Sequence, residues 1–175
     1  MQIGLVRHFK VRHTYPKTLL VGYDELLQWF DHYNGADIEY QDVRPCGVAW
    51  EKCYSSSLPR ALKTAERLFS GDIIRRDDLV ELNLLPLMNT YPKLPLLLWA
   101  VLLRNKSRAS NPITDAFSAR MGAFVDELLR ANDQHVLVAS HGFVMMFLRQ
   151  ELLKRGFTGD RFSTPAHGKI YVFVK

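Results

Sequence analysis

Short, mostly apolar segments alternate with amphipathic segments along the chain. The segments 2–6, 52–56, 72–76, 135–140 and 169–174 have the length and composition of strands buried in a sheet. Between them, apolar residues recur at helical spacing over 24–33, 58–69, 115–131 and 142–155. This alternation predicts an α/β fold, a three-layer α/β/α sandwich around a mostly parallel central sheet. Ser57 and Asp115 are the expected N-caps of their helices.

One stretch, residues 83–113, interrupts the alternation and contains four prolines. We expect it to form an insertion over one end of the sheet, within a single domain that covers residues 1–175. Its apolar part, "LPLLLWAVLL" at 94–103, is too short to cross a hydrocarbon core, which takes about 20 residues. No membrane span is therefore expected. A buried or lid helix is favoured for this part, with association at a membrane surface as the alternative.

The composition is that of a globular protein, with 47% hydrophobic residues in 175. The formal charge of +5 suits anionic ligands in general. Basic residues do not form blocks or alternate with aromatic residues, so we expect no nucleic-acid partner. Two cysteines, Cys46 and Cys53, predict neither a disulfide framework nor a metal site. Because a strand begins almost at the first residue, we expect no secretory signal and a cytoplasmic location.

Charged residues follow the predicted strands at the points where these strands end. Arg7 and His8 end the first strand, Arg60 lies in the first turn of the helix after the second, Glu81 follows the third, and His141 follows the fourth. Ligands of α/β proteins collect at the carboxyl ends of parallel strands. The sequence thus predicts that these five side chains meet at one edge of the sheet.

Four blocks of sequence resemble motifs of the histidine phosphatase superfamily, also called the phosphoglycerate mutase-like family. They are, in chain order, "LVRHFK", "YSSSLPRALKTAERL", "LVELN" and "VASHG". The resemblance implies a phosphatase fold in which His8 is the nucleophile and Glu81 the proton donor. It also implies that Arg7, Arg60 and His141 bind phosphate and that no cofactor is needed.

The sequence departs from the family pattern within its first block. Phe9 stands where the family usually has glycine, and Lys10 stands where an acidic or polar residue is common. Thr14 falls where some members place a phosphate-contacting asparagine, so it is a candidate phosphate ligand. Arg12 and His13 are candidate substrate contacts or solvated loop residues.

The residue types fit phosphoryl transfer on chemical grounds as well. Negative charge spreads over three equatorial oxygens in the transition state, and the planar forks of Arg7 and Arg60 suit those oxygens. His8 can attack phosphorus only while one ring nitrogen is unprotonated, which requires an acceptor for the other nitrogen. The helix that begins near Gly142 would point its amides at the same anion. Glu81 can protonate the leaving oxygen and later activate water.

Closely spaced histidines can be metal ligands, whereas isolated ones are more often structural. His8 and His13 have no neighbouring carboxylate–histidine pattern that would complete a metal site, so no metal is expected. We expect His32, His135 and His167 to be structural.

The sequence therefore predicts a cofactor-independent phosphomonoester hydrolase that acts through a phosphohistidine on His8. Its partner would be a small phosphorylated substrate, with a phosphoprotein as the alternative. Two rival functions stay open. One is a mutase-type phosphotransferase, and the other is a non-catalytic module of the same fold that binds a phosphorylated ligand or a protein.

Overall fold

A six-stranded sheet forms the centre of the molecule, with the strand order β3-β2-β4-β1-β6-β5. The computed structural model describes residues 1–16, 18–43, 46–131 and 133–175. The strands are β1 (Gln2–Arg7), β2 (Lys52–Ser56), β3 (Ile73–Arg76), β4 (His135–Ser140), β5 (Thr158–Gly159) and β6 (Ile170–Val174). Strands β1 to β4 run parallel, whereas β6 is antiparallel to both β1 and β5. The prediction of a mostly parallel sheet is confirmed.

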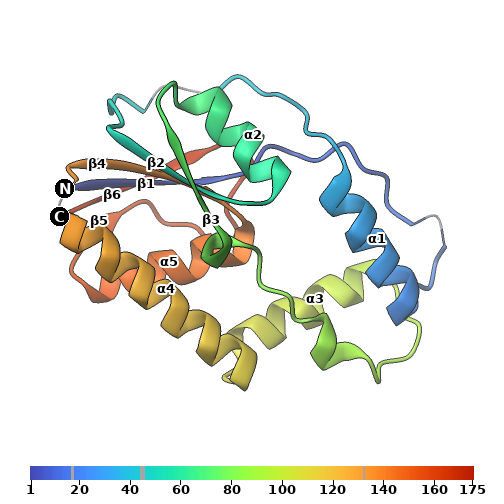
Figure 1. The fold of residues 1–175 in the computed structure, drawn as a ribbon. Coiled ribbons are helices and arrows are strands. Elements are labelled where there is room, and N and C mark those ends of the chain that lie inside the picture. Colours follow the sequence, from blue (N-terminus) through green and yellow to red (C-terminus); the bar gives the residue numbers. More distant parts are fainter. Residues whose placement is uncertain (17, 44–45, 132) are drawn as a thin grey trace.

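Helices cover both faces of this sheet, which confirms the α/β/α sandwich. The helices are α1 (Tyr23–Gly35), α2 (Pro59–Leu68), α3 (Leu96–Arg108), α4 (Pro112–Ala131) and α5 (Gly142–Lys154), and the short 3-10 turns are η1 (Asp77–Leu79) and η2 (Leu85–Met88). Figure 1 shows α2 on one face of the sheet and α4 and α5 on the other. It also shows α1 and α3 together beyond the end of the sheet that lies away from the chain termini.

The central strand β4 contributes side chains to two hydrophobic cores, because successive residues of a strand point to opposite faces. Val136 and Val138 pack in the core that includes Phe124 of α4. Leu137 packs in the core that includes Ala65 of α2. Burial on both faces explains why this strand is a continuous apolar run in the sequence. No helix in the described part of the chain has the length and apolar character needed to cross a membrane.

Two helices begin at proline rather than after the predicted caps. α2 begins at Pro59, so Ser57 lies outside it and is not its N-cap. α4 begins at Pro112, three residues before Asp115. The Asn111 Oδ1 atom accepts hydrogen bonds from the two backbone N–H groups that follow Pro112, at 3.1 and 3.0 Å. Proline suits the first helical position because its missing N–H would be unpaired there. The cap predictions were therefore wrong.

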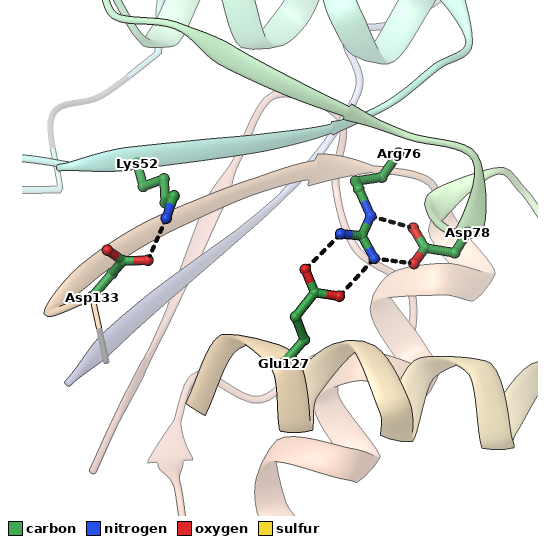
Figure 2. A network of polar contacts seen from close by, with 5 residues as sticks. All are labelled: Lys52, Arg76, Asp78, Glu127 and Asp133. Atoms are coloured by element: carbon green, nitrogen blue, oxygen red, sulfur yellow. Dashed lines mark hydrogen bonds and ion pairs between the residues drawn. The ribbon is translucent and has the colours of Figure 1, made fainter. Parts of the chain in front are cut away.

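A network of charged side chains joins β3 to α4 (Figure 2). The guanidinium of Arg76 donates to Glu127 Oε1 at 2.6 Å and to Asp78 Oδ2 at 2.7 Å. A separate ion pair joins Lys52 of β2 to Asp133, at 2.9 Å. The Arg76 network holds the end of β3 and the turn η1 in place. This turn leads directly to Glu81.

The expected insertion, residues 83–113, contains η2 and α3. The helix α3 starts two residues later and ends five residues later than the apolar stretch 94–103. Trp99 of α3 is fully buried and its Nε1–H donates to the carbonyl oxygen of Val21 at 2.8 Å. It shares a hydrophobic core with Leu26 of α1. These contacts fix α3 against α1. The grouping of all residues into a single domain stays a prediction.

Candidate active site

A pocket of about 590 Å³ is lined by residues from the carboxyl edge of the sheet. Arg7 and His8 follow from β1, Arg60 comes from the first turn of α2, and Glu81 comes from the segment after η1. The structure thus brings four of the five predicted strand-end residues into one pocket. The fifth, His141, does not line the pocket but lies next to His8, with ring centroids 5.2 Å apart.

The backbone around His8 orients its imidazole ring. The His8 N–H donates to the Ser140 carbonyl at 2.9 Å, which continues the pairing of β1 with β4. The His8 Nδ1 atom lies 2.6 Å from the Phe9 carbonyl oxygen. A carbonyl can only accept, so Nδ1 carries the proton and Nε2 keeps its lone pair. Burial, with the positive charges of Arg60 and Arg7, lowers the pKa of His8 to about 2.

Arg60 is almost fully buried and is held by two residues of α1. Its Nη1 donates to Asn34 Oδ1 at 2.7 Å, and its guanidinium lies 5.1 Å from the ring centre of Tyr33. Both contacts fix the plane of the guanidinium fork. Asn34 and Tyr33 also line the pocket. Neither residue was predicted from the sequence, because both lie at the end of a helix that carries no motif of its own.

Arg7 contacts the start of α5. Its Nη1 donates to the Pro165 carbonyl at 3.1 Å. A Cβ atom added at Gly142 would lie 3.6 Å from Arg7 Cζ, so the first residue of α5 lies against this guanidinium. Gly142 itself does not line the pocket. Its role in phosphate binding stays a prediction.

His141 is fully buried, and its imidazole ring forms one hydrogen bond within the described part of the chain. Its Nε2 lies 2.8 Å from the Ser56 Oγ atom at the end of β2. Burial lowers the pKa of His141 well below its usual value, and the charges of Arg60 and Arg7 act in the same direction. Ser56 was missed as a site residue, although it lies within the quoted block "YSSSLPRALKTAERL".

Three buried nitrogen atoms around His8 have no hydrogen-bond partner among the described residues. They are Arg7 Nε, Arg60 Nε and His141 Nδ1. Buried donors in proteins are nearly always paired, so each such group calls for an explanation. All three belong to side chains that surround His8, and two of them are cationic. This arrangement fits a site that receives an anion.

Glu81 lines the pocket on the side of α5. Its Oε1 accepts hydrogen bonds from the N–H groups of Leu82 and Phe143, both at 3.2 Å. Burial raises the pKa of Glu81, while the charge of Arg7 opposes the rise. A carboxyl with a raised pKa is suited to proton donation near neutral pH.

His167 belongs to the pocket, although we expected it to be structural. Its ring centroid lies 5.0 Å from that of His8, and its Nδ1 lies 2.8 Å from the His8 carbonyl oxygen. Burial lowers the pKa of His167, and Arg7 adds to this effect. The residue precedes β6, which runs antiparallel to β1. The start of β6 therefore lies at the same edge as the ends of the parallel strands.

The side chains of Phe9 and Lys10, the two residues that depart from the family pattern, lie away from the pocket. The Phe9 ring is fully buried beside Val11 and lines no part of the pocket. Gly168 has a φ of +68°, and a Cβ atom there would lie 2.9 Å from the Phe9 ring. A residue without a side chain at Gly168 thus makes room for Phe9. Lys10 pairs with Glu39 at 3.5 Å on the surface.

The remaining predicted contacts do not line the pocket. The Thr14 side chain is exposed, while its carbonyl accepts a hydrogen bond from Trp29 Nε1 at 3.0 Å. Arg12 is exposed, and the His13 ring lies 5.3 Å from that of Trp29. Contacts of these three residues with substrate stay predictions. Among the described residues, no group of three or more His, Cys, Asp and Glu side chains could hold a metal ion.

Several solved structures share this fold. A phosphoserine phosphatase from Entamoeba histolytica, in complex with 3-phosphoglyceric acid, is 14% identical with a TM-score of 0.57, over 99% of this chain and 90% of that chain. A mycobacterial glucosyl-3-phosphoglycerate phosphatase is 17% identical with a TM-score of 0.52, over 87% and 79%. The α-ribazole phosphatase of Shigella flexneri is 20% identical with a TM-score of 0.51, again over 87% and 79%. These identities support the likeness of the fold alone.

A comparison with curated proteins finds no match. The family profile "Histidine phosphatase superfamily (branch 1)" matches residues 43–173, a range that includes Arg60, Glu81 and His141. The matched range begins after the block that holds Arg7 and His8, where Phe9 and Lys10 depart from the family pattern. The match covers well over half of the chain. The protein therefore belongs to the histidine phosphatase superfamily.

Proposed function

We propose that the protein is a phosphomonoester hydrolase in which His8 Nε2 carries the phosphoryl group between two steps. The observation that carries this proposal is that three buried nitrogen atoms, on Arg7, Arg60 and His141, have no hydrogen-bond partner among the described residues. A phosphate dianion would accept hydrogen bonds from the two arginine nitrogens and offset the two guanidinium charges. No cofactor is needed in this scheme, since these side chains supply the positive charge that stabilises the transition state.

The first step transfers the phosphoryl group from substrate to protein. The Nε2 lone pair of His8 forms a bond to phosphorus while the bond from phosphorus to the ester oxygen breaks. The proton on Nδ1 stays hydrogen-bonded to the Phe9 carbonyl, so the charge of the phosphohistidine is held in place. Glu81 donates its proton to the leaving oxygen, which departs as an alcohol.

The second step returns the phosphoryl group to water. Glu81, now a carboxylate, takes a proton from a water molecule while the oxygen of that water attacks phosphorus. The bond from phosphorus to Nε2 breaks, and inorganic phosphate leaves with His8 neutral again. Both steps therefore use one carboxyl group and return it to its starting state.

Trapping of the phosphohistidine tests this function. The protein is mixed with an ester that carries labelled phosphate and is then denatured during turnover. We expect a label on the protein that is stable in base and labile in acid, and no label on His8→Ala. His32→Ala, at an exposed position of α1, is the matched control and should keep the label. A label of this kind that survives in His8→Ala would overturn the assignment.

The same experiment separates the rival functions. A mutase would keep the label and return it to an acceptor ester rather than release phosphate to water. A non-catalytic module would bind phosphate or vanadate without forming the label or releasing phosphate from any ester. Either outcome would contradict the hydrolase.

A further inference from the structure

The pocket has a polar end and a much larger apolar part. The polar end consists of Arg7, His8, Arg60, Glu81 and His167. The rest of the lining includes six apolar side chains, which together we call the apolar chamber. They are Leu26, Phe30, Leu85, Leu96, Trp99 and Leu103. The chamber is built by α1, η2 and α3. The insertion 83–113 thus supplies four of these six side chains.

The six side chains of the apolar chamber offer no group that is free to bind a hydroxyl group, because the Trp99 Nε1–H already donates to Val21 and the other five are hydrocarbon. The polar side chains elsewhere in the lining include Asn34, whose Oδ1 accepts from Arg60, and Asn83, whose Oδ1 accepts from the N–H of Leu85 at 3.0 Å. A sugar placed in this chamber would leave most of its hydroxyl groups without partners. Each unpaired buried hydroxyl would weaken binding by about 5-fold to 150-fold. The chamber therefore selects against polyhydroxylated esters.

The charges of the lining also select against a second anionic group. Arg7 and Arg60 are the only lysine or arginine residues among the described residues that line the pocket, and both lie at the polar end. Away from that end, the charged residue of the lining is Asp31, which is acidic. A second phosphate or a carboxylate would find no cation there. Bisphosphates and phosphorylated carboxylic acids fit this pocket poorly.

We propose that the substrates are phosphomonoesters with a single phosphate and a large apolar organic group. This inference rests on the proposed hydrolase function and names its substrate class. The pocket volume of about 590 Å³ falls in the range of small-molecule sites, about 300–1,000 Å³. Trp99 holds the chamber wall in place through its hydrogen bond to Val21, so the apolar surface is formed before substrate binds.

A series of straight-chain alkyl phosphates from ethyl to octyl tests the substrate class. The leaving oxygen has nearly the same chemistry throughout the series, so differences in kcat/KM report contacts of the chain. We expect kcat/KM to rise by about threefold to fourfold for each added methylene group that enters the chamber. Glucose 6-phosphate should be turned over more slowly than butyl phosphate.

A variant that fills the chamber provides the structural control. Ala100 lines the pocket and is exposed on α3, so the substitution Ala100→Trp adds a ring to the chamber without disturbing a core. We expect it to lower kcat/KM for octyl phosphate at least tenfold more than kcat/KM for ethyl phosphate. Val101→Trp, on the same helix but outside the pocket lining, is the matched control and should retain the chain-length dependence.

The outcomes distinguish this inference from the proposed function. A flat alkyl series, or faster turnover of glucose 6-phosphate, would overturn the apolar substrate class and leave the hydrolase intact. No turnover of any ester would overturn both. Turnover of free octyl phosphate without turnover of phosphatidic acid in phosphatidylcholine vesicles indicates a dissolved substrate. Turnover of both indicates a membrane lipid of the same chemical class.

Discussion

At the scale of single residues, His8 and Glu81 have pKa values that the same pocket shifts in opposite directions. Burial disfavours the charged form of each group, so it lowers the pKa of His8 to about 2 and raises that of Glu81. A neutral imidazole and a protonated carboxyl can then coexist at one pH. Such a pair is what nucleophilic attack and general acid catalysis require together.

The substitution Glu81→Gln tests the acid role. A proton donor matters most when the leaving oxygen is strongly basic, so turnover of alkyl phosphates should fall by about 10²–10⁴-fold. Turnover of p-nitrophenyl phosphate, whose leaving group needs little protonation, should fall much less. The measurement is the ratio of kcat/KM for the two esters, with Glu66→Gln at an exposed position of α2 as the control. Equal losses on both esters would assign the acid role to another residue.

The pH profile of the unsubstituted protein belongs to the same prediction. In the proposed mechanism Glu81 is protonated at the start of the first step, and its pKa is raised above the usual value of 4.5. We expect kcat/KM for alkyl phosphates to fall as the pH rises through this raised pKa. The profile for p-nitrophenyl phosphate should stay flatter over the same range.

At the scale of elements, the segment that carries Glu81 depends on the contacts of Arg76. One guanidinium bridges Asp78 in η1 and Glu127 in α4, which a lysine ammonium cannot reproduce with the same fork geometry. We expect Arg76→Lys to lower the free energy of unfolding by about 1 kcal/mol, because the partly exposed Glu127 limits the effect through solvent screening. Chemical denaturation measures the change.

The same variant has an expected effect on activity. Loosening of η1 displaces Glu81, so alkyl phosphates should lose more activity than p-nitrophenyl phosphate. Arg67→Lys, at an exposed position of α2, is the matched control. An unfolding free energy of Arg76→Lys equal to that of the control would show that the network does not stabilise the fold.

The elements that could be predicted from the sequence are those with a strong local pattern. The predicted strand 135–140 has the bounds of β4, and the segment 169–174 differs from β6 by one residue. An apolar run does not encode strand direction, however, and β6 is antiparallel. For this reason His167 was not placed at the site. Asn34 and Tyr33 were missed because their contacts with Arg60 depend on the packing of α1 beside α2.

At the scale of the whole molecule, the fold places three buried or half-buried histidines beside two arginines. Burial lowers the pKa values of His8, His141 and His167, and the arginine charges add to the effect. The folded protein thus keeps these rings neutral where the unfolded chain would protonate them. The proposed phosphate site is in this way linked to the global stability of the protein.

This linkage predicts how stability depends on pH. Below the ordinary histidine value of 6.5, the unfolded chain binds protons that the folded protein does not, so stability falls as the pH falls. For His8 this loss continues until the pH reaches its folded pKa of about 2. Between about pH 6.5 and 5.5 each neutral buried histidine should cost about 1 kcal/mol of unfolding free energy. Glu81 acts in the opposite direction, because its folded pKa is raised.

We compare the unsubstituted protein with His8→Asn and with the double variant His8→Asn/His141→Asn. Because Glu81 is common to all three proteins, the differences isolate the histidine contribution to the pH dependence of the unfolding free energy. We expect the loss of unfolding free energy between about pH 7.5 and 5.5, measured by urea denaturation, to shrink in the single variant and further in the double variant. His32→Gln, at an exposed position, should keep the full dependence. Vanadate should reduce the dependence in the unsubstituted protein, because an anion beside His8 and His141 favours their protonated forms. Equal pH dependence in all the variants would mean that the buried rings do not stay neutral on folding.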